Sequence, residues 1–250
     1  DDPFNFFKKN INSTLTLYSS ILELIKKKLF QMPKIIQISS DEVYGDIKNN
    51  FSSENSLLNP TSPYSSSKAS SDLLAKSFMY TFNFKLSILR VCNNFGPYQF
   101  LEKFVPTILN KISQNKKIPV YGSGKNLREW IYVLDTCKAI EVIIKNFKNG
   151  ADYNVGTKYR LSNLNLLKKI LYLKGLKNFE DCIQFVSDRP AHDRRYALKS
   201  DKIKKEIGWK ASTSLEKGLK STIKWYALNL NWSKKMRKKF QDKRIGLYFN

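Results

Sequence analysis

Hydrophobic residues recur along this chain at two spacings, and the alternation between the two predicts helices and strands in turn. Between residues 5 and 28 the apolar positions fall at steps of three and four, which is typical of an amphipathic helix. Residues 34–39 form a short, mostly apolar run rich in β-branched side chains, which is typical of a buried strand in a parallel sheet. The chain is therefore expected to open on a helix that leads into a parallel strand.

The same alternation continues through most of the chain. Further helices are expected at 64–82, 103–115, 135–147, 161–174, 199–207 and 214–230, and further extended segments at 85–91, 118–121, 127–133, 152–155 and 182–186. Strands that alternate with helices predict an α/β fold with a parallel sheet. Residues 233–250 are expected to form a basic, disordered tail.

Chemically useful side chains follow the first predicted strand. Ser40, Asp41 and Glu42 come directly after it, and ligands of open α/β sheets bind just beyond the carboxyl ends of strands. A proline then starts a helix that carries Tyr64 and Lys68 one turn apart on the same face. An ammonium beside a phenol favours the phenolate and lowers its pKa toward the range of a useful base. Together these groups can move protons and a hydride on a sugar.

The Tyr-x-x-x-Lys spacing alone is weak evidence, because it occurs twice more in this lysine-rich chain. Tyr44 and Lys48 are separated by a glycine just after a strand, and Tyr121 and Lys125 by two glycines in a predicted turn. Neither pair is expected to be helical. Only the pair in the 64–82 helix combines a helix start with carboxylates upstream.

Later loops carry further candidates. Residues 92–100 are dense in amide and aromatic side chains. The segment can simply form turns, or its Asn amides can face sugar hydroxyls, and the sequence leaves both possibilities open. Arg128 lies among aromatic residues and is a natural bidentate partner for a diphosphate. Residues 187–196 hold three of the eight arginines and the only histidine, His192, so this loop is either structural or grips an anion.

Composition narrows the possible classes. A chain of 250 residues, 42% hydrophobic and 13% aromatic, can bury a substantial core, and none of its apolar runs is long enough to span a membrane. The net charge of +23 is mostly lysine, which favours a solvated surface over a nucleic-acid or membrane partner. Cys92, Cys137 and Cys182 lack a CxxC pattern, which indicates reduced thiols and no metal site. With no signal peptide visible at Asp1, a cytoplasmic location is expected.

Five motifs carry a resemblance that extends from about residue 3 to 232. They are Ser-Ser-Asp-Glu-Val-Tyr-Gly at 39–45, Pro-Tyr-Ser-Ser-Ser-Lys at 63–68, Asn-Asn-Phe-Gly-Pro-Tyr-Gln-Phe-Leu-Glu-Lys at 93–103, Arg-Glu-Trp-Ile-Tyr-Val at 128–133 and Asp-Arg-Pro-Ala-His-Asp-Arg-Arg-Tyr at 188–196. By these motifs the chain resembles the nucleotide-sugar 4,6-dehydratases of the extended short-chain dehydrogenase/reductase family. Related epimerases generally lack the Asp-Glu pair, and related decarboxylases keep the Glu without this Asp.

The resemblance implies an NAD-dependent lyase that converts dTDP-glucose to dTDP-4-keto-6-deoxyglucose and water. Tyr64 would take the proton of the C4 hydroxyl while a hydride moves from C4 to NAD, with Lys68 assisting both. Glu42 would then remove the C5 proton and Asp41 would protonate the departing C6 hydroxyl, after which the hydride returns to C6. Ser40 stands where the family usually has Thr and would bond O4. A UDP-sugar dehydratase or decarboxylase is the alternative enzyme.

The resemblance also implies binding residues and an architecture. Substrate contacts are expected at Asn93, Lys103, Tyr121, Arg128, Asn154, Arg189 and His192, and cofactor contacts at Asn10, Ser39, Tyr64 and Lys68. The implied fold is a partial Rossmann-type parallel sheet, formed by 1–92 and 126–157. A smaller C-terminal α/β substrate-binding domain would be formed by 93–125 and 158–232. A homodimer is expected.

One departure from the family concerns the front of the chain. The Gly-rich turn and first strands of the family have no counterpart here, a difference of roughly 60 to 90 residues if βα units run about 30 each. Two explanations stay open: a fragment of a longer enzyme, or a shortened relative that binds nucleotide sugars without catalysis. Half a sheet is expected to expose an unpaired strand edge and an apolar face.

Overall fold

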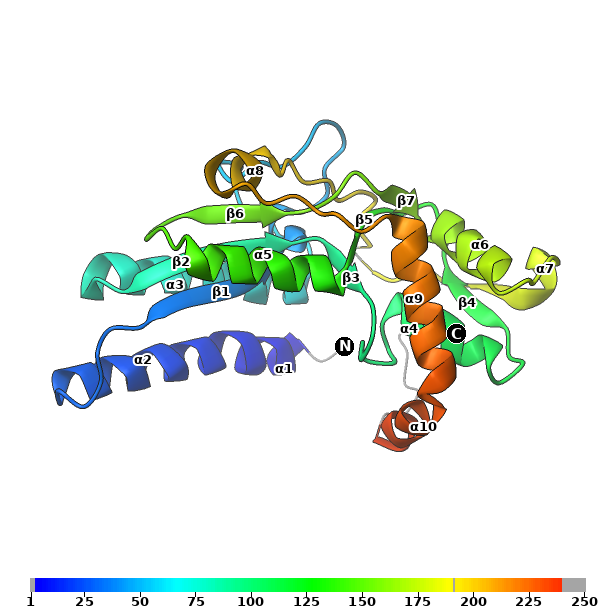
Figure 1. Cartoon of the computed structure of the whole chain (residues 1–250), viewed down its shortest axis with the longest axis horizontal. Helices are drawn as coiled ribbons and strands as arrows, with labels where there is room; N and C mark the ends of the chain where they lie inside the picture. Colours follow the sequence, from blue (N-terminus) through cyan, green and yellow to red (C-terminus); the bar gives the residue numbers. More distant parts are fainter. Residues whose placement is uncertain (1–2, 191, 240–250) are drawn as a thin grey trace. The chain divides into compact units, whose positions relative to one another are not determined.

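Two compact units make up the chain in its computed structural model, which describes residues 3–190 and 192–239 (Figure 1). Unit 1 contains the described residues of Asp1–Cys92, Thr136–Thr157 and Arg195–Ala211, and unit 2 those of Asn93–Asp135, Lys158–Arg194 and Ser212–Asn250. The predicted division placed 126–135 with the first part and 195–211 with the second, and the structure exchanges both segments. Backbone pairing is the reason: residues 127–132 pair with strands of unit 2, and residues 195–199 bond to residues 47–52 of unit 1.

Unit 1 is built on a parallel sheet of three strands. Their order is β1 (Lys34–Ser40), β2 (Lys85–Val91) and β6 (Asp152–Val155). Ser40 is in register with Val91, which pairs in turn with Val155, so the three strands end level with one another. The predicted α/β fold with a parallel sheet is confirmed, and the bounds of these strands agree with their apolar runs to within a residue.

The prediction that β1 is a buried strand is wrong. β1 lies at the edge of the sheet, with β2 on one side and no strand from the described part of the chain on the other. Of its residues only Ser39 is buried, and Ile38 is 42% exposed. Burial of an apolar run depends on a second neighbour, which the described residues do not supply, so the expected open edge is present in them.

Two long helices supply most of the core of unit 1. In α2 (Ser13–Lys26), Tyr18 is fully buried, and its ring packs edge-on against Phe78 of α3 (Pro63–Phe82) with 5.4 Å between ring centroids. Phe84, just before β2, closes the same cluster. These contacts fix α3, the helix that carries the predicted Tyr/Lys pair, against the sheet.

Shorter elements complete unit 1. A short helix α1 (Pro3–Phe7) and a π-helical turn (Lys8–Asn12) precede α2, so the predicted single helix at 5–28 is interrupted. Helix α5 (Val133–Lys145) runs along the near side of the sheet in Figure 1. Helix α8 (Asp201–Ile207) packs against β6.

Unit 2 combines two small sheets with helices. One sheet is formed by β3 (Asn93–Phe95), β5 (Leu127–Tyr132) and β7 (Arg160–Ser162), and the other by β4 (Ile118–Tyr121) and β8 (Ile183–Val186). The helices are α4 (Phe104–Ile112), α6 (Asn163–Leu173), α7 (Phe179–Cys182), α9 (Leu215–Leu228) and α10 (Leu230–Lys239). The segment 92–100 was expected to be a loop, but its residues 93–95 form β3, because pairing with β5 outweighs their turn-forming composition.

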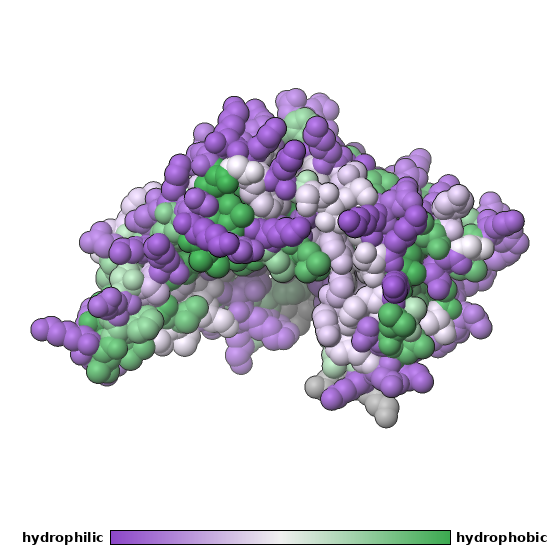
Figure 2. Space-filling model, in the orientation of Figure 1, coloured by the Kyte–Doolittle hydropathy of each residue, from purple (hydrophilic) through white to green (hydrophobic). Residues whose placement is uncertain are grey.

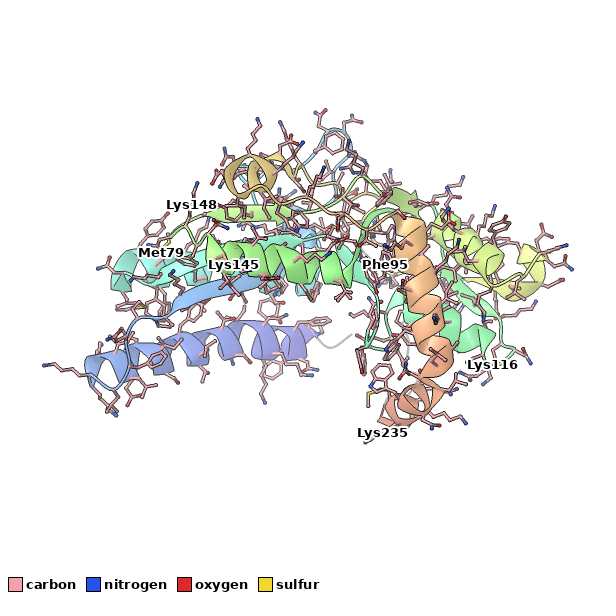
Figure 3. All side chains as sticks on the ribbon, in the orientation of Figure 1. Met79, Phe95, Lys116, Lys145, Lys148 and Lys235 are labelled. Carbon is pink, nitrogen blue, oxygen red and sulfur yellow. The ribbon has the colours of Figure 1, made fainter. Side chains whose placement is uncertain are left out.

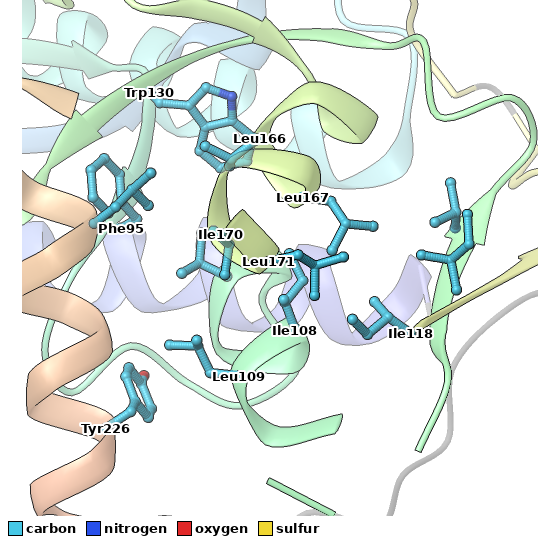
Figure 4. Packing of buried hydrophobic residues seen from close by; sticks show 14 of the residues in the cluster. Phe95, Ile108, Leu109, Ile118, Trp130, Leu166, Leu167, Ile170, Leu171 and Tyr226 are labelled. Atoms are coloured by element: carbon cyan, nitrogen blue, oxygen red, sulfur yellow. The ribbon is translucent and has the colours of Figure 1, made fainter. Parts of the chain in front are cut away.

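A cluster of apolar side chains forms the core of unit 2 (Figure 4). On α6, the helix expected at 161–174, Leu166, Leu167, Ile170 and Leu171 are buried on one face. Trp130 from β5 joins them. This packing holds the strands of unit 2 whose ends carry predicted binding residues.

The predicted disorder of the tail is wrong for residues 233–239, which belong to α10. Trp232 packs edge-on against Trp225 of α9 with ring centroids 5.2 Å apart. That aromatic contact anchors a segment whose many lysines had suggested a solvated tail. The remaining tail residues, 240–250, lie outside the described part of the chain.

Much of the positive charge is on solvated surface. In unit 1, Lys145 pairs with Glu141 at 2.6 Å and Lys148 with Glu206 at 3.0 Å (Figure 3). Exposed pairs of this kind contribute little to stability. Within residues 3–190 and 192–239, no helix is long and apolar enough to cross a membrane, and His, Cys, Asp and Glu side chains form no group of three that could hold a metal ion.

Candidate active site

The carboxyl end of β1 runs into a 3₁₀ turn, Asp41–Tyr44, which we call the acidic turn. Ser40 caps it: its Oγ accepts a hydrogen bond from the Glu42 amide at 3.2 Å and donates one to Asp41 Oδ1 at 3.3 Å. The turn ends at Gly45, whose φ of 71° is left-handed, and a Cβ there would collide with a backbone carbonyl oxygen. The local sequence therefore fixes where the two carboxylates lie.

Helix α3 starts with a capping box. Ser62 Oγ accepts a hydrogen bond from the Ser65 amide at 3.2 Å, and Ser65 Oγ accepts one from the Ser62 amide at 3.0 Å. The sequence prediction relied on Pro63 alone and missed this box. The box sets the first residue of the helix, and with it the direction of the Tyr64 and Lys68 side chains one turn apart.

Lys68 ties the start of α3 to the end of β1. Its Nζ donates a hydrogen bond to the Ile38 carbonyl oxygen at 2.7 Å. Burial lowers the pKa of Lys68, and the negative charge of Asp72 opposes that change. An ammonium carries three N–H donors, so one bond to the sheet leaves donors for other oxygens.

Tyr64 lies beside the groups that follow β1. Burial raises the pKa of Tyr64, the charges of Glu42 and Asp41 raise it further, and a hydrogen bond with Ser40 lowers it. The prediction that Lys68 lowers this pKa is therefore wrong for the chain by itself, because burial and two carboxylates dominate and the ammonium is directed at a backbone carbonyl. The structure thus brings all five predicted catalytic residues to one corner of unit 1, with Tyr64 a neutral phenol at pH 7.

The predicted cofactor residues Asn10 and Ser39 belong to the same unit. Asn10 Nδ2 donates to Ser67 Oγ at 2.8 Å, and the Asn10 carbonyl oxygen accepts a bond from Ser71 Oγ at 3.1 Å. Both of these serines are buried on α3, so Asn10 anchors that helix. Ser39 is buried at the end of β1. Contact of either residue with a cofactor stays a prediction.

In unit 2, the loop after β8 aligns three polar side chains. His192 Nδ1 lies 2.6 Å from Asp188 Oδ1, and its Nε2 lies 3.0 Å from Arg189 Nη2. A guanidinium can only donate, so Nε2 accepts and Nδ1 donates its proton to the carboxylate. Arg189 also lies over the Tyr121 ring, 5.4 Å from its centroid. These four residues, Asp188, Arg189, His192 and Tyr121, form what we call the loop cluster.

Asp188 was not singled out from the sequence, although it stands four residues before His192. Burial would raise the pKa of the Asp188 carboxyl, but hydrogen bonds from His192 and the Arg189 amide hold it below its usual range. Gly122, with a φ of 52°, makes room for this carboxylate, because a Cβ there would lie 2.5 Å from Asp188 Oδ2. The glycine directly after Tyr121 was the signal in the sequence that another group packs closely at this position.

Arg128 is fixed from inside unit 2. It is buried, its Nη1 donates to the Leu127 carbonyl oxygen at 2.9 Å, and its Nη2 donates to the Asp193 carbonyl oxygen at 2.8 Å. These bonds hold the guanidinium in one orientation. Its predicted contact with a diphosphate stays a prediction.

Asn93 and Lys103 lie at the start of β3 and just before α4. The Oδ1 of Asn93 is buried and accepts no hydrogen bond from the described part of the chain. Such an acceptor is costly unless a ligand or water satisfies it. Lys103 is exposed and pairs with Glu102 at 3.1 Å. Both remain predicted substrate contacts.

Asn154 is held by hydrogen bonds on both sides of its amide. It is fully buried in unit 1, where its Oδ1 accepts a bond from the Tyr44 hydroxyl at 2.9 Å. Its Nδ2 donates to the carbonyl oxygens of Ser52 and Lys199 at 2.9 and 3.3 Å. These bonds hold the amide in one orientation, and the substrate contact of Asn154 stays a prediction.

Comparisons with known proteins identify relatives of the whole chain. The model of a protein family described as GDP-mannose 4,6 dehydratase matches residues 1–222. A probable dTDP-glucose 4,6-dehydratase from Sinorhizobium fredii is 36% identical over 97% of this chain and 72% of its own length.

Two solved structures show the same fold. DesIV, a dTDP-glucose 4,6-dehydratase from Streptomyces venezuelae with NAD and TYD bound, has a TM-score of 0.86 and 33% identity over 92% of this chain and 69% of its own. The dTDP-glucose 4,6-dehydratase of Bacillus anthracis in complex with NAD has a TM-score of 0.84 and 37% identity over 94% and 73%. By motifs, fold and matched length, the chain belongs to the GDP-mannose 4,6 dehydratase family.

Proposed function

We propose that the protein is a dTDP-glucose 4,6-dehydratase that uses NAD as its cofactor and releases dTDP-4-keto-6-deoxyglucose and water. The observation that carries this proposal is the corner of unit 1 where Tyr64 bonds to Ser40 and lies beside the carboxyl groups of Glu42 and Asp41. Relatives named dTDP-glucose 4,6-dehydratase favour dTDP-glucose over the GDP-mannose of the family description.

The groups at this corner fit the nicotinamide end of NAD. Lys68 keeps N–H donors beyond its bond to β1, and these suit the ribose hydroxyls. Tyr64 lies one turn earlier on the same face of α3, and Ser39 and Asn10 complete our assignment. When bound, NAD accepts a hydride from C4 of the sugar and returns it to C6.

Side chains of unit 1 move the protons. In its phenolate form, Tyr64 accepts the proton of the C4 hydroxyl, and Ser40 donates a hydrogen bond to the same oxygen. The positive charge of a bound nicotinamide would favour this phenolate over the neutral phenol of the chain by itself. The new C4 ketone makes the C5 proton acidic, Glu42 removes it, and Asp41 protonates the C6 hydroxyl, which leaves as water. Glu42 then returns its proton to C5 when the hydride is added at C6. Adjacent like charges enforce different protonation states. Asp41 is 3% exposed and Glu42 half-buried, which supports Asp41 as the protonated member.

We assign recognition of the nucleotide to unit 2. Arg189 and Arg128 are the charged donors for the diphosphate, and both are already held by other groups, so little side-chain freedom is lost on binding. The remaining contacts in this assignment are Asn93, Lys103, Tyr121 and His192. Nucleic acids and membranes are not among the partners we propose.

The test is turnover by the full chain. With dTDP-glucose and NAD, mass spectrometry is expected to show a product lighter by one water, with a ketone at C4. Tyr64→Phe should lower the rate by about 10²- to 10⁴-fold. Tyr172→Phe, which alters a tyrosine of α6 that is 81% exposed, should keep the wild-type rate.

Competing donors complete this test. UDP-glucose, UDP-glucuronate and GDP-mannose are offered in parallel, and preferred turnover of one of them would replace dTDP-glucose as the substrate. If none is dehydrated, the proposal is wrong. Binding of dTDP without binding of NAD would then indicate a non-catalytic nucleotide-sugar binder.

We infer a homodimer from the two long helices of unit 1. Leu17 and Leu24 on α2 are 56% and 41% exposed, and Leu73 and Tyr80 on α3 are 60% and 76% exposed. Residues seven apart share a helix face, so each helix presents an apolar stripe. Figure 2 shows hydrophobic residues at the surface over α2.

Sedimentation of variants tests the homodimer. Leu24→Lys combined with Leu73→Glu should yield monomers, whereas Leu228→Lys, at a leucine of unit 2 that is 73% exposed, should not change the assembly. A wild-type protein that sediments as a monomer at micromolar concentration would contradict the inference.

We also place the protein in the cytoplasm. Cys92 is buried, Cys137 exposed and Cys182 half-buried, and all are free thiols. Free thiols of this kind persist in reducing compartments. Fractionation of cells that produce the protein checks this location.

A further inference from the structure

Arg90 is a buried cation to which the proposed chemistry gives no role. It lies on β2, and its side chain is 2% exposed. Its Nε donates to Asp72 Oδ2 at 2.9 Å, its Nη1 to the Tyr44 hydroxyl at 3.1 Å and its Nη2 to Asp152 Oδ2 at 3.2 Å. A charge buried this deeply is tolerated only when it is paired and hydrogen-bonded. The three hydrogen bonds of Arg90 meet this requirement and use three polar groups of the interior.

Each partner comes from a different element of unit 1. Asp72 is fully buried on α3, one turn after Lys68. Tyr44 is the last residue of the acidic turn, two residues after Glu42. Asp152 starts β6. One guanidinium therefore bonds to both of the elements that carry the catalytic residues.

The Tyr44 hydroxyl is held from two sides. It accepts the bond from Arg90 and donates one to Asn154 Oδ1 at 2.9 Å, and the guanidinium lies 5.3 Å from the centroid of its ring. Ser40 caps the other end of the acidic turn. Asp41 and Glu42 are thus carried between two anchored ends.

The surrounding charges are balanced. Asp152 Oδ2 also pairs with Lys76 Nζ at 2.7 Å, so two cations face two carboxylates. Although burial alone would lower the pKa of Arg90, Tyr44, Asp72 and Asp152 together raise it. Arg90 therefore stays charged near neutral pH and is a fixed cation at the centre of this cluster.

We propose that Arg90 is a positioning residue, which holds the acidic turn, through Tyr44, in register with the Tyr/Lys face of α3, through Asp72. The proposal rests on the proposed function for the reaction that is positioned. A planar guanidinium presents five N–H donors in a fixed fork, so it can join three elements at once, which the compact ammonium of a lysine cannot. Misplacement of a reacting group by about 1 Å can lower a rate about a hundredfold.

Tyr44→Phe tests the link to the acidic turn with a single hydroxyl removed. Hydrogen exchange of the full chain, followed by mass spectrometry, should show peptides covering 40–45 exchanging about two- to tenfold faster, as expected for loss of one or two hydrogen bonds. Peptides covering 64–72 should keep their wild-type rates. Tyr153→Phe is the matched control, because this buried tyrosine bonds at 3.0 Å to Glu206 of α8 and to neither catalytic element.

Turnover provides a second readout that a purely structural bond would not move. In Tyr44→Phe we expect kcat to fall about tenfold to a hundredfold, while KM for dTDP-glucose changes less than about twofold. Oxidation at C4 depends on α3 and is spared, whereas elimination depends on the acidic turn and is slowed. A transient rise in NADH absorbance should therefore precede product in this variant but not in Tyr153→Phe.

Arg90→Lys extends the test to both links. It should speed hydrogen exchange in peptides covering 40–45 and 64–72 together. The reason is that an ammonium cannot replace the bonds of the guanidinium to Tyr44 and Asp72 at the same time. Wild-type exchange of 40–45 in Tyr44→Phe, or equal loosening in Tyr153→Phe, would overturn the proposal even if Arg90→Lys fails to fold. If the wild-type chain forms no product, the proposed function fails, while exchange still decides whether Arg90 positions the acidic turn.

Discussion

Two arginines of this chain lie in polar clusters, and they are arranged in opposite ways. Arg90 in unit 1 is 2% exposed and pairs with Asp72, which is fully buried. Arg189 in unit 2 is exposed, and it bonds to the neutral ring of His192, behind which Asp188 is 45% exposed. Arg90 directs its bonds to partners inside unit 1 and acts as framework, whereas Arg189 at the surface keeps donors for an incoming ligand. Burial, more than residue type, separates the two roles.

Stability should show the largest difference between the two clusters. Asp72→Ala leaves Arg90 short of a buried partner, which costs about 3–5 kcal/mol. Asp188→Ala removes a partly exposed carboxylate and should change the free energy of unfolding by less than about 1 kcal/mol. Urea unfolding followed by circular dichroism measures both, and equal midpoints for the two variants would remove the contrast.

Nucleotide affinity should separate the clusters in the other direction. Arg189→Ala is expected to weaken dTDP binding by about tenfold to a hundredfold, since a hydrogen bond to a charged group contributes about 1.5–3 kcal/mol. Lys116→Ala, at an exposed lysine of the same unit, serves as the charge-matched control. Isothermal titration with dTDP measures both affinities. An equal loss of affinity in Lys116→Ala would show that Arg189 acts only through the overall charge.

The smallest expected effect is a pH dependence of the loop cluster. Burial, and then the charge of Arg189, hold the pKa of His192 below its usual range, against the opposing effect of Asp188. The folded pKa thus lies below the unfolded value of about 6.5, so the stability that neutral His192 contributes is present above that pH and is lost as the pH falls through the folded pKa.

Proton NMR can follow this titration directly, because the chain has a single histidine. The midpoint should lie below about 6.5, rise in Arg189→Ala and fall further in Asp188→Asn. A wild-type midpoint above the unfolded value would show that the carboxylate dominates, and that the ring is not the neutral acceptor described above.

Strands β1 and β2 of unit 1 could be predicted because each is a mostly apolar run between breaks, and such runs are local signals. The exposure of β1 could not, because it depends on which strand lies beside it. Likewise β3 was missed, since three residues of loop-like composition become a strand only through pairing with β5. Local pattern identifies elements, and their neighbours decide their burial.

The proximity of the five proposed catalytic residues could be predicted for a similar reason. Ser40, Asp41 and Glu42 directly follow a strand, and the tyrosine and lysine lie one helical turn apart, so both sets are visible in the sequence. The direction of the Tyr64 pKa was not visible, because it depends on burial and on carboxylates from another element. The bond between Asn154 and Tyr44 was not visible either, because the sequence does not show which side chain lies beside an asparagine at a strand end.

The open side of β1 has a practical consequence for anyone who handles this chain. A row of backbone groups beside partly exposed isoleucines is a template on which a second molecule can extend the sheet. Concentrated samples are therefore expected to form fibrous aggregates slowly during storage. Slow aggregation, more than thermal unfolding, will then limit how long they can be used.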